Sequence, residues 1–112
     1  MLSDSLPMVL LFDIYGSLLT EKQRACFDLA YNQDFSLSEI GEECGISRQG
    51  VHDTLQRTEQ ALLTWESALG CGERELRLRK AEEKLLLLAE HLADRPEEAG
   101  ELRSIVALLQ KE

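Results

Sequence analysis

The stretch SLSEIGEECGISRQGVHDTLQRTE, residues 36–59, decides the fold. Ser36 begins an S-x-x-E capping box, in which two backbone donors at a helix start are satisfied reciprocally. A short helix would follow, and Gly45 can take the left-handed conformation that ends such a helix in a tight turn. Ser47 is suited to cap the next helix. This order of cap, short helix, turn and second cap predicts a helix-turn-helix with its core motif at residues 36–58.

The second helix of this motif is expected to be long. After Ser47, only Gly50 interrupts a helix-forming run until the GCG of residues 70–72, so the helix would extend over about 20 residues. The stripe predicted to face inward comprises Val51, Leu55, Thr58 and Leu62. The polar residues outside that stripe are the candidate DNA contacts, namely Arg48, Gln49, His52, Gln56 and Arg57.

The preceding part of the chain also favours helices. A second capping box, formed by Thr20 and Gln23, opens another helix. Residues 8–18 are expected to form a shorter helix capped by Asp4 or Ser5. Gly and Pro are scarce, and the apolar–polar alternation typical of strands is absent. The sequence therefore predicts an all-α protein.

A C-terminal extension is expected at residues 73–112, separate from a helix-turn-helix domain at residues 1–69. Its first helix has apolar residues at alternating spacings of three and four, which is heptad spacing. These residues are Leu78, Ala81, Leu85, Leu88 and Leu92. A last helix, starting near Pro96, would present Leu102, Ile105, Val106 and Leu109. This apolar content exceeds what two solvated helices need, so the extension is expected to serve packing or homodimerisation.

Charge argues against strong attraction to nucleic acid. The formal net charge is −9, divided as −2 over residues 1–19, −5 over 20–66 and −2 over 67–112. Long-range attraction to phosphates should therefore be weak or repulsive. One short basic patch, RELRLRK at residues 74–80, differs from the rest. Its possible phosphate contacts are Arg74, Arg77, Arg79 and Lys80. Pairing of these residues with neighbouring acids is the alternative.

Composition excludes several other classes. With 44% hydrophobic and 29% charged residues, the chain resembles a small folded domain with a modest core. Three cysteines without CxxC spacing favour free thiols, and two scattered histidines do not complete a zinc site. Asp13 interrupts the apolar run at residues 8–12, and no base precedes Lys22, so neither a membrane span nor a signal peptide is expected. We expect a cytoplasmic protein with no metal, no cofactor and no membrane insertion.

Two quoted segments carry a family resemblance. LFDIYGSLLTEKQR, residues 11–24, and SLSEIGEECGISRQGVHDTLQRTEQALLTWE, residues 36–66, resemble the YlxM family of small bacterial helix-turn-helix proteins. The resemblance covers roughly residues 8–69. It implies a fold like the C-terminal helix-turn-helix region of bacterial sigma factors, and a regulatory or accessory role linked to the signal recognition particle pathway.

The resemblance also implies roles for individual residues. The helix starting after Ser47 would be the recognition helix, with Arg48, Gln49 and His52 at base edges. Two positions depart from the family pattern: His52 stands where a Tyr is usual, and Gly50 where an Ala is usual. Gly50 loosens the first turn by up to about 1 kcal/mol relative to Ala.

Two classes of function remain open from the sequence. The first is a nucleic-acid-binding regulator, acting weakly or as a dimer on DNA, or on signal recognition particle RNA. The second is a protein-interaction module that keeps the helix-turn-helix shape without reading DNA. The cap and turn pattern favours the first class, whereas the acidity favours the second. No nucleophile elbow, Gly-rich phosphate loop or paired-carboxylate motif indicates an enzyme.

Overall fold

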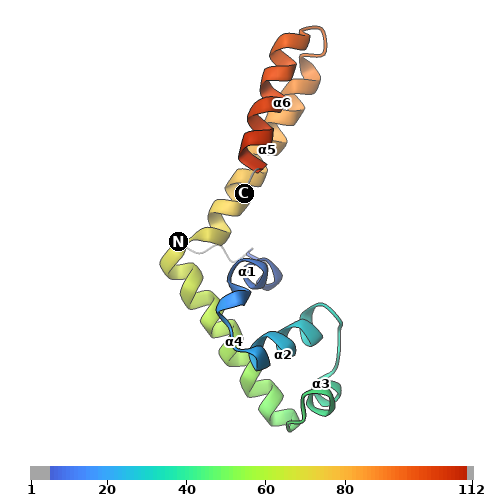
Figure 1. Cartoon of the computed structure of the whole chain (residues 1–112), viewed down its shortest axis with the longest axis vertical. Coiled ribbons are helices and arrows are strands. Elements are labelled where there is room, and N and C mark those ends of the chain that lie inside the picture. Colours follow the sequence, from blue (N-terminus) through green and yellow to red (C-terminus); the bar gives the residue numbers. More distant parts are fainter. Residues whose placement is uncertain (1–5, 111–112) are drawn as a thin grey trace. The chain divides into compact units, whose positions relative to one another are not determined.

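The protein is all-helical over residues 6–110, the part of the chain that the structure, a computed structural model, describes (Figure 1). The elements are α1 (Met8–Tyr15), η1 (Gly16–Leu18), α2 (Glu21–Tyr31), α3 (Leu37–Cys44), α4 (Arg48–Leu69), α5 (Cys71–His91) and α6 (Pro96–Gln110). The prediction of an all-α fold is confirmed. The chain divides into two compact units, an N-terminal unit ending at Gly72 and a C-terminal unit beginning at Glu73.

The first helix is shorter than the sequence predicts. Instead of one helix over residues 8–18, α1 ends at Tyr15 and a 3-10 turn continues to Leu18. Pro7 occupies the N-cap position of α1, and the predicted caps Asp4 and Ser5 lie outside the described residues. The change at Gly16 fits its weak preference for a regular helix.

Capping at α2 follows the sequence prediction. The Gln23 backbone N–H donates to Thr20 Oγ1 at 3.1 Å, and the Thr20 N–H donates to Gln23 Oε1 at 3.0 Å. At the other end, the Asp28 carboxylate accepts hydrogen bonds from the Asn32 and Gln33 side chains at 2.8 Å each. These bonds hold the pKa of the Asp28 carboxyl below its ordinary value. Both ends of α2 are therefore set by local side-chain contacts.

One buried cluster joins α1 and α2 to the middle of α4. It comprises Leu11, Tyr15, Leu19, Phe27 and Leu62. The Phe27 ring stacks between those of Phe12 and Tyr31, with ring centroids 4.5 Å and 4.1 Å away. The Tyr31 hydroxyl donates to the Glu59 carboxylate on α4, and partial burial together with this bond raises the pKa of Tyr31 to about 12. This cluster fixes the orientation of α4.

A second cluster lies beneath the first half of α4. Its buried members are Cys26 from α2, Ile40 from α3 and Val51 from α4. Leu55 packs against both clusters and so connects them. Val51, Thr58 and Leu62 are fully buried, as the predicted inward stripe requires. Two helices, α2 and α3, thus hold the start of α4 through one apolar cluster.

Gly41 permits the close crossing of α3 and the turn that follows it. A Cβ atom added there would lie 2.7 Å from the carbonyl oxygen of Ile46, a distance that real Cβ atoms essentially never show. The obstacle is backbone, so a rotamer change cannot relieve it. The Ile46 N–H also donates to the Gly41 carbonyl at 3.0 Å. Gly41 therefore sets how closely the turn packs on α3.

A buried carboxylate closes the far end of α4. Glu66 is 1% exposed and accepts from the Tyr15 hydroxyl at 2.8 Å and from the Gly72 N–H at 2.7 Å. The Cys71 N–H donates to the same Tyr15 oxygen at 3.1 Å. Burial, followed by the Glu66 hydrogen bond, raises the pKa of Tyr15 well above its ordinary value. Of the three residues in the predicted GCG hinge, only Gly70, with φ of 68°, lies between two helices, because α5 begins at Cys71.

The C-terminal unit is an antiparallel pair of helices, α5 and α6 (Figure 1). Within one chain, the predicted heptad stripe on α5 is only partly covered, since Ala81 is exposed and Leu88 is 47% exposed. Ala89 is buried instead, and on α6 Ala99 and Val106 are buried while Ile105 is 39% exposed. The fully covered positions of the two helices are therefore small residues, and the leucines of the stripe are less covered.

Gly41→Ala should destabilise the N-terminal unit by about 1–3 kcal/mol, because the overpacking at the turn exceeds the gain in helix propensity. Urea unfolding monitored by Trp65 fluorescence measures the change. The matched control is Gly16→Ala, whose Cβ would meet the Phe12 ring at an ordinary 3.5 Å. We expect the control to change the midpoint little. A Gly41→Ala protein as stable as the control would contradict the steric role of Gly41.

Candidate nucleic-acid interface

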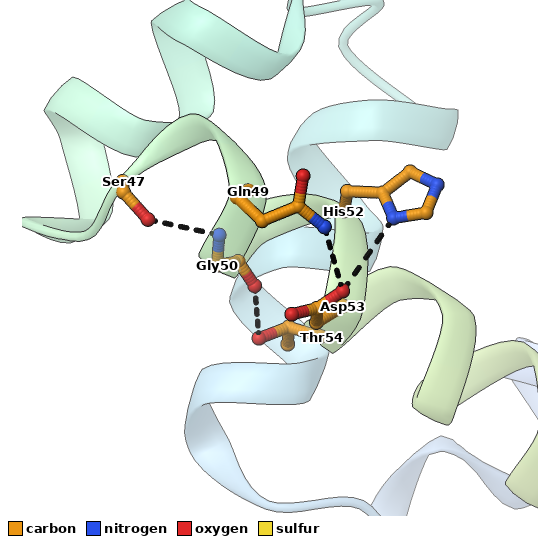
Figure 2. Close-up of polar contacts among 6 residues, drawn as sticks. All are labelled: Ser47, Gln49, Gly50, His52, Asp53 and Thr54. Carbon is orange, nitrogen blue, oxygen red and sulfur yellow. Dashed lines mark hydrogen bonds and ion pairs between the residues drawn. The ribbon is translucent and has the colours of Figure 1, made fainter.

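The helix-turn-helix is built as the sequence predicts. The Glu39 N–H donates to Ser36 Oγ at 3.1 Å, and the Ser36 N–H donates to Glu39 Oε1 at 2.8 Å. The latter bond holds the pKa of the Glu39 carboxyl below its ordinary value. Gly45 is left-handed with φ of 71°, and Ser47 Oγ accepts from the Gly50 N–H at 3.0 Å to start α4 (Figure 2). The predicted caps and turn are confirmed.

The five candidate DNA contacts all reach solvent from the first half of α4. Those residues are Arg48, Gln49, His52, Gln56 and Arg57, and each is exposed. Val51 and Thr58, on the same helix, are fully buried in the core. The start of α4 therefore exposes hydrogen-bond donors to solvent on one side, while its opposite side is buried in the core. The assignment of these residues to DNA binding stays a prediction.

A carboxylate lies among the predicted base-reading side chains. The Gln49 amide Nε2 donates to Asp53 Oδ1 at 3.0 Å, and His52 Nδ1 lies 3.6 Å from the same oxygen (Figure 2). The side chains of His52 and Asp53 are 55% and 49% exposed, so this cluster is open to solvent. The contact to His52 becomes an ion pair only when the imidazole is protonated. Asp53 thus orders the polar face and also gives it a negative charge.

The Asp53 carboxylate would repel phosphates, and this residue is not among the candidates predicted from the sequence. Its second role, as the acceptor for Gln49, has a sequence signal in the spacing of four residues, which places the two side chains on the same helix face. Behind this face, Thr54 Oγ1 donates to the Gly50 carbonyl at 2.8 Å (Figure 2). One turn further on, Thr58 Oγ1 donates to the Thr54 carbonyl at 2.7 Å. Both threonine hydroxyls on this side of α4 therefore already donate to backbone carbonyls of the same helix.

In the C-terminal unit, all four cations of the predicted basic patch, Arg74, Arg77, Arg79 and Lys80, are exposed. Arg79 Nε also pairs with Glu75 Oε2 at 2.8 Å, and the role of the patch in phosphate binding stays a prediction. Helical spacing places Arg77, Lys80 and the exposed Lys84 on one side of α5. Lys84 was missed because the basic run in the sequence ends at Lys80. These three cations form the basic row of α5.

The described residues offer little sign of other kinds of site. Within residues 6–110, no three His, Cys, Asp or Glu side chains gather in a way that could hold a metal ion. In the same part of the chain, no helix is both long and apolar enough to cross a membrane. The exposed polar face of α4 is therefore the candidate site that the fold builds most clearly.

A capped short helix, a left-handed turn and a long helix with an exposed first half define a helix-turn-helix protein. The family model described as "UPF0122: Putative helix-turn-helix protein, YlxM / p13 like" matches residues 2–102. The chain belongs to this family. The match includes the whole of the N-terminal unit beyond its first residue and much of the C-terminal unit.

Curated relatives carry the same family name. A UPF0122 protein of Thermoanaerobacter sp. (strain X514) is 54% identical over 71 residues, which cover 63% of this chain and 61% of the relative. One from Caldanaerobacter subterraneus subsp. tengcongensis is 48% identical over 82 residues, covering 73% of this chain and 70% of the relative. One from Halalkalibacterium halodurans is 54% identical over 69 residues, covering 62% and 63%. The matched segment thus spans less than two thirds of some of these relatives.

Asp53→Asn should strengthen binding of a nucleic-acid duplex to the N-terminal unit by about 1 kcal/mol at low salt, because it removes a negative charge from the α4 face. The amide oxygen can still accept from Gln49, so the local geometry is kept. Fluorescence anisotropy at two salt concentrations measures the change. The control is Asp13→Asn on α1, which alters the net charge equally and should have a smaller effect. Equal effects of both variants would show that only total charge matters.

Proposed function

We propose that this protein is a nucleic-acid-binding helix-turn-helix regulator that places the first half of α4 in the major groove of DNA. The observation that carries the proposal is the exposed face of α4 immediately after the Gly45 turn. In helix-turn-helix proteins, base contacts come from the N-terminal residues of the second helix. Arg48 and Gln49 have the donors that suit guanine and adenine edges.

The other polar residues of α4 are assigned by their position. Arg57 lies more than two turns from the helix start and suits a phosphate, which positions a protein without carrying sequence information. Gln56 is a further polar contact, and His52 contacts a base edge beside Gln49. The basic row of α5 supplies additional phosphate attraction. The signal recognition particle RNA, to which the YlxM resemblance points, is the second nucleic acid that deserves a test.

Acidity limits the expected affinity. The charge of −5 over residues 20–66 repels phosphates at long range. We therefore propose weak binding by one chain, and tighter binding when two copies contact paired half-sites. The alternative is a protein-interaction module. Asp53 favours this alternative, because its carboxylate already accepts a hydrogen bond from Gln49, one of the proposed base-reading residues. In that case the same α4 face would contact a protein.

Two arginine variants distinguish base reading from phosphate contact. Arg48→Ala should cost about 1–3 kcal/mol at a preferred DNA site and reduce discrimination against other sites. Arg57→Ala should weaken binding to all sequences about equally and reduce the salt slope by about 1. Titrations use genomic fragments from the source organism and its signal recognition particle RNA, at low and physiological salt. The matched control, Arg103→Ala, removes an exposed arginine from α6 instead.

Equally weak binding by the wild-type protein and the Arg48→Ala variant would contradict a role in reading nucleic acid. If the wild-type protein and Arg48→Ala bind every fragment and the RNA equally weakly at low salt, α4 does not read nucleic acid. The protein-interaction module would then be the better description. If Arg48→Ala and Arg103→Ala lose affinity equally, binding is electrostatic and not selective.

Homodimerisation is proposed as part of this function. Large apolar side chains remain exposed on the C-terminal unit, at 41% for Leu86, 51% for Leu87, 47% for Leu88 and 73% for Leu108. Such side chains are costly to leave in water, at about 25 cal/mol per Å² of apolar surface. A second copy of the α5–α6 pair would cover them and would also supply a second α4 helix.

Leu108→Lys tests this association and should shift the protein toward monomer at micromolar concentrations, because a charge replaces apolar contact surface. Sedimentation velocity measures the distribution. The control is Leu18→Lys, which places the same change at a 59% exposed leucine of the N-terminal unit and should leave association unchanged. A monomeric wild-type protein would remove the dimer proposal. Leu85 is less suitable for this test because it is half-buried within the C-terminal unit itself.

A further inference from the structure

Two thiols meet inside the helix-turn-helix core. Cys26 on α2 is fully buried, and Cys44, the last residue of α3, is half-buried against the same apolar cluster. Their Sγ atoms lie 3.9 Å apart, and both side chains are free thiols. The third cysteine, Cys71, is an exposed free thiol at the start of α5 and provides an internal reference.

The two sulfur atoms are in contact, about 2 Å farther apart than in a disulfide. A disulfide joins sulfurs about 2.0 Å apart, with Cβ atoms about 3.5–4.5 Å apart. Bond formation requires both cysteine side chains to leave their present positions so that the two Sγ atoms approach each other. The contact joins two helices that are adjacent in the core, so a covalent bond there would constrain α3 relative to α2.

We propose that Cys26 and Cys44 are a dithiol–disulfide site, which a small-molecule disulfide such as glutathione disulfide oxidises reversibly to an intramolecular bond. The Cys44 thiolate attacks one sulfur of the reagent and releases one glutathione thiolate. The Cys26 thiolate then attacks Cys44 Sγ and releases the second glutathione. Two electrons pass from the cysteine pair to the reagent, and the two thiol protons end on the two glutathione molecules.

The order of attack follows from access. Cys44 is half-buried and can meet a reagent, whereas Cys26 has no exposed surface. Burial, together with its hydrogen bond to Cys44, raises the pKa of the Cys26 thiol to about 11, which keeps its thiolate fraction small. Its attack on Cys44 is intramolecular, and the existing contact favours that step over a second external thiol. Cys44 is therefore the entry point and Cys26 the resolving thiol.

Oxidation should stabilise the helix-turn-helix. The new bond would close the loop that contains the end of α2, the left-handed Asp34 and all of α3. Such a cross-link mainly restricts the unfolded chain. Val51 of α4 packs on the same cluster, so the bond would form directly beneath the start of α4. The oxidised protein is expected to keep its fold and unfold at a temperature several degrees higher.

The test uses the wild-type full-length chain in glutathione redox buffers, followed by acid quenching, alkylation, proteolysis and mass spectrometry. The expected product is a linked pair of peptides containing Cys26 and Cys44, lighter by two hydrogens, while Cys71 carries glutathione. Dithiothreitol should restore both free thiols. A stable glutathione adduct on Cys44 beside a free Cys26 would overturn the proposal. Reaction of Cys71 alone would overturn it as well.

Two variants add a matched control. Cys71→Ser should yield the same linked peptides and the same rise in unfolding temperature, since it keeps the buried pair. Cys26→Ala should leave Cys44 as a glutathione adduct with no such rise. If Cys26→Ala does not fold, the peptide mapping of the wild-type chain decides the question alone. None of these measurements depends on nucleic-acid binding, so they remain decisive whichever partner α4 contacts.

Discussion

The close packing of the Gly45 turn on α3 is the constraint on which the rest of the N-terminal unit depends. It exists because Gly41 has no Cβ, which would otherwise lie 2.7 Å from the Ile46 carbonyl oxygen. The turn directs the chain into α4, where Val51, Thr58 and Leu62 are buried against the preceding helices. Once those three residues are fixed, helical geometry decides that Arg48, Gln49 and His52 face solvent. A steric contact between two backbone segments thus determines which side chains are offered to a partner.

Electrostatics acts on this geometry in two opposing ways. Asp53 accepts a hydrogen bond from Gln49 and lies 3.6 Å from His52, so it orders the exposed face. The same carboxylate repels phosphates, and the surrounding N-terminal unit is acidic. Under the proposed function, a protein with this balance would rely on short-range donors and on a second copy more than on long-range attraction. Asp53 therefore orders the exposed face of α4 and, under the proposed function, would lower its affinity for nucleic acid.

Local patterns in the sequence predicted most of the N-terminal unit. The capping boxes at Thr20 and Ser36, and the turn at Gly45, depend on contacts within a few residues, which sequence spacing records. On α5, heptad spacing could not tell whether Leu88 or Ala89 is buried within one chain. That choice depends on how closely two helices approach. Similarly, the spacing of four residues permits the Gln49–Asp53 bond without requiring it, and the thiol pair depends on how α2 packs on α3.

The most direct test of the account is amide NMR of the isotopically labelled protein during titration with duplex DNA from its own genome. The account predicts that shift changes at low salt concentrate at residues 48–57 and diminish as salt rises. Changes should also appear at the Gly41 and Gly45 amides, which support the start of α4. Shift changes confined to α5 and α6, or none at any salt concentration, would contradict the claim that the Gly45 turn presents α4 to nucleic acid.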